Sequence, residues 1–156
     1  IGPVLCGRLA KWLENEGLTE RVDLIEDFQL NIEHALDLQG RELALFIDAG
    51  QNTPAPFIFA RIYPSTATAH TTHALPPETV LQVYRQTEGS EPPPAFVLCI
   101  RGERFELGEG LSADAGKHLD AARRHLARCL ATPTAAAWRK WQTPGPVGEL
   151  SAYASP

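Results

Sequence analysis

Short apolar segments without a polar interruption alternate along this chain with stretches whose apolar residues recur at helical spacing. Residues 43–47 and 96–100 are each five apolar residues long, a pattern typical of strands buried on both faces. The alternation predicts an α/β fold, in which helices cover both faces of a largely parallel sheet. We predict strands at residues 21–28, 43–47, 57–63 and 95–101, and helices at residues 3–16, 31–38, from Pro76 or Pro77 onward, and 112–130.

Capping residues mark the ends of several predicted helices. The side chains of Asn31 and Ser112 can accept hydrogen bonds from the free backbone N–H groups of a first helical turn. Proline is favoured in the same turn, so we expect Pro76 or Pro77 to open the third helix and Gly17 to end the first.

A single domain fits the length of 156 residues, because a chain of this size can bury one sizeable core. We assign residues 1–133 to this domain. Residues 134–156 are rich in Gly, Pro, Ala and Ser, so we interpret them as a C-terminal tail that drapes over the surface or is disordered. Since the chain has no methionine and its first predicted element is the helix at residues 3–16, which would ordinarily follow a strand, we expect upstream residues that contain a first strand.

Composition argues against several classes of protein. A net charge of −5 does not favour a nucleic-acid partner, and the apolar runs are far shorter than the roughly 20 residues of a membrane span. No signal-peptide pattern is present in the sequence. We therefore expect a soluble protein in the cytoplasm.

The three cysteines, Cys6, Cys99 and Cys129, are far apart in the sequence. An odd count without a C-x-x-C pair argues against a disulfide framework and against a zinc site made of thiolates. We interpret them as buried free thiols in a reducing compartment.

Asp48 is the first candidate site residue, because it directly follows the apolar run 43–47. In open α/β sheets, ligands bind outside the carboxyl ends of the strands. A carboxylate at this position can serve as a metal ligand or as an acid/base group. The alternative is that Asp48 only caps a turn before Gly50.

His70 and His73 lie in a loop rich in Ser, Thr and Ala that follows the predicted strand 57–63. Neutral imidazole is a suitable ligand for nickel, zinc or copper. Either histidine could instead be an ordinary polar loop residue. The remaining histidines, which we interpret as solvated residues of helices, are His34, His118 and His125.

Two further acidic pairs could reach a site, although each also has a structural interpretation. Glu26 and Asp27 end the predicted strand 21–28, where they could equally form the entry to a loop. Glu106 and Glu109 lie in a turn before the last long helix, and they could be turn or helix-entry residues.

Standard catalytic motifs do not occur in the sequence: there is no G-x-S-x-G, no P-loop, no G-x-G-x-x-G and no H-E-x-x-H. Residues 138–141 (WRKW) combine basic and aromatic side chains, as a nucleic-acid or partner contact can. On an acidic chain we favour a packed or loosely docked tail.

Several segments, in their order and spacing, resemble the nickel–iron hydrogenase maturation proteases over nearly the whole chain up to about Leu130. The sequence at residues 26–38 and 105–112 is most similar to the branch that serves soluble, cofactor-reducing hydrogenases. The segments are residues 22–30 (VDLIEDFQL), 32–38 (IEHALDL), 45–49 (LFIDA), 72–81 (THALPPETVL) and 102–112 (GERFELGEGLS).

The resemblance implies a fold and a reaction. The fold is a three-layer αβα sandwich with a twisted, mostly parallel five-stranded sheet, of which this chain lacks the first strand. The reaction is that of an aspartic-type endopeptidase, which removes the C-terminal extension of a hydrogenase large-subunit precursor. Nickel in that precursor is the recognition mark, and a surrogate divalent metal could replace it in vitro. The precursor is the implied partner of a monomeric protein.

The resemblance also implies roles for individual residues. Asp48 matches the second metal ligand of the family, and His73, which leads directly into the proline and helix, matches the histidine ligand. The first acidic ligand is expected upstream of Ile1. Without a serine or thiol nucleophile, Asp48 or Glu26 could assist water as the general base.

Two other functions stay open on the sequence alone. A non-catalytic nickel-sensing or precursor-binding protein could keep this fold and lack an acidic ligand. A small-ligand α/β hydrolase is a weaker possibility, because the chain has no recognisable nucleophile.

Overall fold

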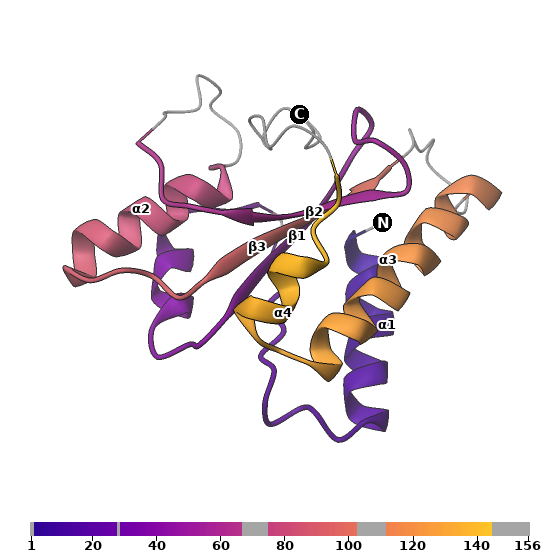
Figure 1. The fold of residues 1–156 in the computed structure, drawn as a ribbon, viewed down its shortest axis with the longest axis horizontal. Coiled ribbons are helices and arrows are strands. Elements are labelled where there is room, and N and C mark those ends of the chain that lie inside the picture. Colours follow the sequence, from indigo (N-terminus) through magenta and orange to yellow (C-terminus); the bar gives the residue numbers. More distant parts are fainter. Residues whose placement is uncertain (1, 28, 67–74, 103–111, 145–156) are drawn as a thin grey trace.

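The computed structural model describes residues 2–27, 29–66, 75–102 and 112–144, which form a mixed α/β fold (Figure 1). The α/β class is as predicted, but the strict alternation of helices and strands is not, because β1 and β2 follow one another directly. The elements in chain order are α1 (Gly2–Asn15), the 3-10 helix η1 (Ile32–Leu38), β1 (Ala44–Gly50), β2 (Phe57–Ile62), α2 (Pro77–Glu88), β3 (Ala95–Arg101), α3 (Ala113–Ala131) and α4 (Ala135–Lys140).

The described strands form a mixed sheet in the order β1-β3-β2. β1 pairs with β3 in parallel, whereas β2 pairs with β3 in antiparallel orientation. The short connection at residues 51–56 explains why β2 runs antiparallel to its neighbour. A parallel return of the chain needs a crossover of a dozen or more residues, so β2 must run opposite to β1.

The predicted strand at residues 21–28 is not a strand where the structure describes it. Residues 22–27 form neither helix nor strand, although Val22 and Leu24 still pack against the core. A strand exists only through its hydrogen-bonded neighbour, and the described neighbour of β1 is β3. We expected a sheet of five strands, and the described residues form three.

β3, rather than the run at 43–47, is the fully buried strand. Every residue of β3 from Ala95 to Ile100 is buried, because β3 lies in the middle of the sheet. The apolar residues of β1 are only half-buried, because β1 has a neighbouring strand on one side alone among the described residues. An apolar run thus indicated a strand correctly but did not indicate which strand is central.

Helices cover both faces of the sheet with separate apolar clusters (Figure 1). On one face, α1, α3 and α4 pack against alternate residues of the strands, with Phe59, Phe96 and Leu98 at the centre. On the other face, η1 and α2 pack against the intervening residues, among them Ala60 and Val97. The two-residue period of a strand produces this division.

The predicted helix caps are present. Ser112 accepts a hydrogen bond from the N–H of Ala115, and Asn31 accepts one from the N–H of Glu33. His34 completes the cap of η1, because its Nδ1 accepts a hydrogen bond from the N–H of Asn31 at 3.0 Å. Its Nε2 lies 3.0 Å from Asp27, and the side chain is 12% exposed, so the prediction of a solvated His34 is wrong.

The segment that we interpreted as a tail contains a helix with a core residue. Trp138 of α4 is 3% exposed, and its indole N–H donates to the carbonyl oxygens of Cys129 and Thr132 at 2.8 and 3.1 Å. After α4 the chain runs along the outer edge of β2, where Thr143 N–H donates to the carbonyl of Phe59 at 2.9 Å. Residues 134–144 are therefore packed, which their composition did not indicate.

The three cysteines are free, and Cys99 and Cys129 are buried as predicted, while Cys6 is half-buried. Among the described residues, no helix combines the length and apolar character needed to cross a bilayer.

Candidate active site

Asp48 lies at the carboxyl end of β1, directly opposite Cys99 of the parallel neighbour β3. Successive side chains of a strand point to opposite faces, so Asp48 shares a face with Ala44 and Phe46. That is the face covered by α2. The sequence therefore predicted the position of this carboxylate correctly, at the carboxyl end of a strand.

The Asp48 carboxylate is in a partly desolvated place. Its Oδ1 accepts a hydrogen bond from the N–H of Ala49 at 2.7 Å, which lowers the pKa. Burial acts in the opposite direction and is the larger effect, so the pKa of Asp48 is raised. The side chain is still exposed at the surface, and protein atoms behind it remove part of its water. Such a carboxylate binds a cation or a proton more readily than a fully hydrated one.

Glu78 is a second carboxylate at this place, and the sequence analysis did not single it out. It lies in the first turn of α2, where Pro76 provides no side-chain cap. Burial raises the pKa of Glu78, while a hydrogen bond from its own backbone N–H lowers it. The sequence could have indicated Glu78, because an acidic residue directly after two prolines is typical of a helix N-terminus, which favours negative charge.

Cys99 connects the two carboxylates. Its side chain is 2% exposed, and burial, followed by the charges of Asp48 and Glu78, raises the pKa of the thiol to about 12. Both carboxylates are thus near enough to act on one buried sulfur. A thiol with this pKa stays protonated at neutral pH, so Cys99 is not a nucleophile.

The loop after Asp48 is tied to the end of β3. Arg101 donates from its guanidinium to the carbonyl oxygen of Thr53 at 3.0 Å, and its backbone N–H donates to the carbonyl of Pro56 at 3.0 Å. The N–H of Gly102 donates to the carbonyl of Gly50 at 3.0 Å. These contacts hold the backbone next to Asp48 in place, which a site with a defined geometry requires.

Glu26, the other predicted general base, lies next to α1. It interacts with the thiol of Cys6, whose pKa is raised first by burial, then by the hydrogen bond to Glu26 and by its charge. The remaining site candidates of the sequence analysis, which lie outside the described residues, are His70, His73, Glu106 and Glu109.

The described residues supply some of the donor atoms that a metal ion would need. Asp48 and Glu78 carry oxygen donors, and the charge of each acts on the thiol of Cys99. Within the described ranges, no three or more His, Cys, Asp and Glu side chains are grouped so that they could hold a metal ion. His73, the histidine ligand that the resemblance implies, lies outside the described residues.

His125 is a packed residue rather than a solvated one. Its ring lies 4.9 Å from the ring of Phe57 and 4.4 Å from the ring of Phe59, measured between centroids. Its Nε2 is buried and has no hydrogen-bond partner among the described residues. Burial, and then the charge of Arg128, lowers the pKa of His125. The prediction of a solvated His125 is therefore wrong.

We expect His125 to make the fold less stable in mild acid. Its pKa in the unfolded chain is about 6.5, and the folded value is lower, so the unfolded chain takes up the proton first. The stability is complete above pH ~6.5 and falls as the pH decreases toward the folded pKa. Urea unfolding of the wild type and of His125→Phe, at pH 8 and in mild acid, tests this. The variant should lose less stability on acidification, and equal losses would contradict the prediction.

No protein-family model, no curated protein and no solved structure matched this chain. Its function is therefore argued from the residues and their arrangement.

Proposed function

We propose that this chain is a processing endopeptidase of the nickel–iron hydrogenase maturation type. It recognises nickel in a hydrogenase large-subunit precursor and removes the C-terminal extension of that precursor. One observation carries the proposal: the carboxylate of Asp48, at the carboxyl end of β1, shares its sheet face with the start of α2. The segment that leads into α2 carries His73, the second proposed ligand.

Nickel enters this proposal as part of the substrate. Asp48 and His73 would bind the ion that the precursor carries, and a site with only a few protein ligands leaves positions for the precursor's own donors. The raised pKa of Asp48 supports the assignment, because a partly desolvated carboxylate gains from a cation. A surrogate divalent metal would bind to the same donors.

Asp48 is better placed than Glu26 to assist water in the cleavage step. A general base works best when its pKa lies near the working pH, and burial moves the pKa of Asp48 in that direction. Glu26 instead lies next to Cys6 of α1. The protonated thiol of Cys99 supports an aspartic-type reaction over a thiol-dependent one. Glu78 would orient groups near Asp48.

The proposal includes the finer architecture of a three-layer sandwich around five strands. The outer edge of β1 has no strand partner among the described residues, and the apolar side chains of residues 44–47 are half-buried. Such an edge is a template for a further strand. We also propose that the protein is a cytoplasmic monomer, because its precursor would be matured there.

The proposal is tested with a purified large-subunit precursor, prepared with nickel and without it. The chain should shorten the nickel-loaded precursor by its C-terminal extension, as measured by intact mass, and should leave the nickel-free precursor unchanged. Equal trimming of both forms would contradict the role of nickel. Tight binding of the nickel-loaded precursor without any cleavage would instead assign the non-catalytic, nickel-sensing function.

A further inference from the structure

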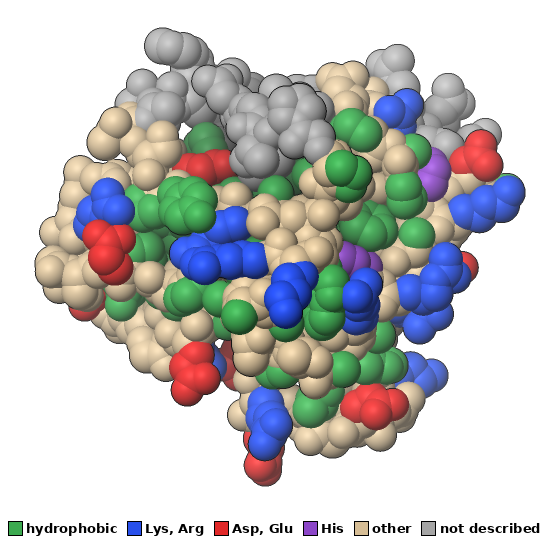
Figure 2. Space-filling model, in the orientation of Figure 1, with side chains coloured by type: hydrophobic (Ala, Val, Ile, Leu, Met, Phe, Trp, Pro, Cys, Tyr) green, Lys and Arg blue, Asp and Glu red, His purple; other side chains and the backbone are tan. Residues whose placement is uncertain are grey.

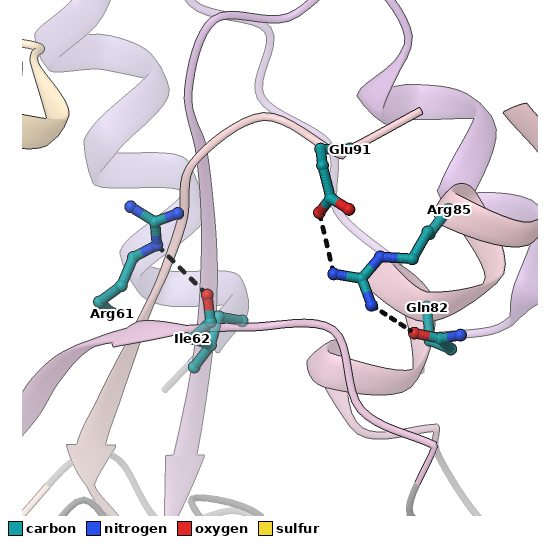
Figure 3. Close-up of polar contacts among 5 residues, drawn as sticks. All are labelled: Arg61, Ile62, Gln82, Arg85 and Glu91. Atoms are coloured by element: carbon teal, nitrogen blue, oxygen red, sulfur yellow. Dashed lines mark hydrogen bonds and ion pairs between the residues drawn. The ribbon is translucent and has the colours of Figure 1, made fainter. Parts of the chain in front are cut away.

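Arg61 of β2 has a guanidinium group that is only partly hydrogen-bonded by the described residues. The group lies 4.9 Å from the ring centre of Tyr63 and 5.6 Å from that of Phe96. Its Nε donates to the carbonyl oxygen of Ile62 at 3.3 Å, and its Nη1 is buried without a partner among the described residues (Figure 3). Arg85 in the same view is held by Glu91 and Gln82.

The surroundings of Arg61 disfavour the charged form of its guanidinium group. Burial lowers the pKa of Arg61, the charge of Arg139 lowers it further, and of the groups that act on it only Tyr63 favours the charged form. No carboxylate of the described residues contributes. Arg61 is half-buried as a whole, and its charge has no opposite charge among the described residues, so the position is suited to an anion from another molecule.

The charge of Arg139 acts on Arg61, and further cations lie on α3 and α4. Arg139 and Lys140 are exposed at the end of α4, and the guanidinium of Arg128 lies 4.2 Å above the ring centre of Trp141. Figure 2 shows basic side chains gathered over α4 and along α3, with acidic side chains mainly toward the rim. We define Arg61, Arg128, Arg139 and Lys140 as the basic face. It stands out on a chain with a net charge of −5.

Among the described aromatic residues of this region, Tyr63 alone is largely exposed, at 61%, so no row of open rings is available to stacked bases. Trp138 is buried in the core, and the ring of Trp141 is covered by Arg128. Tyr63 is covered on one side by Arg61. Single-stranded nucleic acids bind through stacking on open rings, whereas carboxylates bind to the edges of guanidinium groups. The basic face presents guanidinium edges and an ammonium group.

We propose that the basic face binds an acidic peptide segment of a partner protein, with one carboxylate of that segment bound by Arg61. This inference is independent of the proposed protease function, since the basic face includes none of the residues assigned to the cleavage site. Arg61 and Arg139 would supply paired N–H donors, and Arg128 and Lys140 would attract the segment over a longer range.

The first test measures the binding of a fluorescent oligoglutamate peptide by anisotropy at low salt. The exposed double variant Arg139→Gln/Lys140→Gln should weaken binding about 10-fold. Its matched control, Lys11→Gln/Arg21→Gln, makes the same charge change at exposed positions of α1 and the loop after it, and should bind as the wild type does. No binding to the wild type, or an equal loss in the control, would overturn the proposal. So would tighter binding of an oligothymidylate probe.

The second test uses the cost of the unpaired charge. Arg61→Met keeps an apolar stem between the rings and removes the guanidinium, so its melting temperature should rise by about 2–4 °C while the affinity for oligoglutamate falls. A rise in stability with a loss of binding is the sign of a residue kept for a ligand. A lower melting temperature, or unchanged peptide affinity, would show that Arg61 is not an anion-binding residue.

Discussion

Asp48→Asn is expected to abolish trimming of the nickel-loaded precursor, with a loss of about 100-fold or more. The amide keeps the volume of the carboxylate, and its oxygen can still accept the hydrogen bond from the N–H of Ala49. It cannot take up a proton or donate charge to a metal ion. Because burial already disfavours the charged carboxylate, the melting temperature should stay level or rise. Cleavage followed by intact mass, and a thermal melt, measure the two effects.

The matched control for this variant is Asp37→Asn, which removes the charge of an exposed aspartate in η1 and should trim normally. His73→Ala should lose activity as Asp48→Asn does, whereas His70→Ala should retain most of it. Normal trimming by Asp48→Asn or by His73→Ala would refute the assignment of the site. Equal losses in both histidine variants would mean that the choice between the two is wrong.

Trp138→Ala is expected to destabilise the fold by about 3–5 kcal/mol, a large part of the 5–15 kcal/mol that typically separates folded from unfolded chains. The indole packs edge-on against the rings of Phe59 and Phe96, at centroid distances of 5.9 and 5.3 Å. Its removal leaves a cavity between α4 and the sheet. It also leaves the carbonyl oxygens of Cys129 and Thr132 without their indole donor. Urea unfolding monitored by circular dichroism measures the change.

Trp141→Ala is the control, because the same substitution three residues later affects a half-buried ring that packs at the edge of the core and under Arg128. Its cost should be about 1–2 kcal/mol. If Trp138→Ala cost no more than this, residues 134–144 would be a loose tail after all. The comparison separates the loss of a core residue from the loss of an aromatic residue in general.

The elements that the sequence predicted well are those whose cause is local. The strand at residues 95–101 and the caps at Asn31 and Ser112 are confirmed. An apolar run bounded by polar residues specifies a strand within a few positions, and a cap depends on one side chain and the next N–H groups. Asp48 belongs with them, because its place at the end of a strand follows from its immediate neighbours.

The errors concern residues whose state depends on distant partners. A strand at 21–28 requires a neighbouring strand, and the structure shows none beside residues 22–27 in the part that it describes. His125 looked polar among charged neighbours, yet the rings of Phe57 and Phe59 surround it. Trp138 lies in a segment of low periodicity, and only its position over the sheet makes it part of the core.

The sequence by itself determined most of the helices and the three described strands, and it placed an acidic residue near the end of one strand. Only the tertiary structure decided that β3 is the central strand, that Glu78 and Cys99 lie near Asp48, and that Arg61 has no carboxylate partner among the described residues. The physical reason is the distance along the chain over which each effect acts. Periodicity and capping act over a few residues, whereas burial and electrostatics depend on what the folded chain brings together from far along its length.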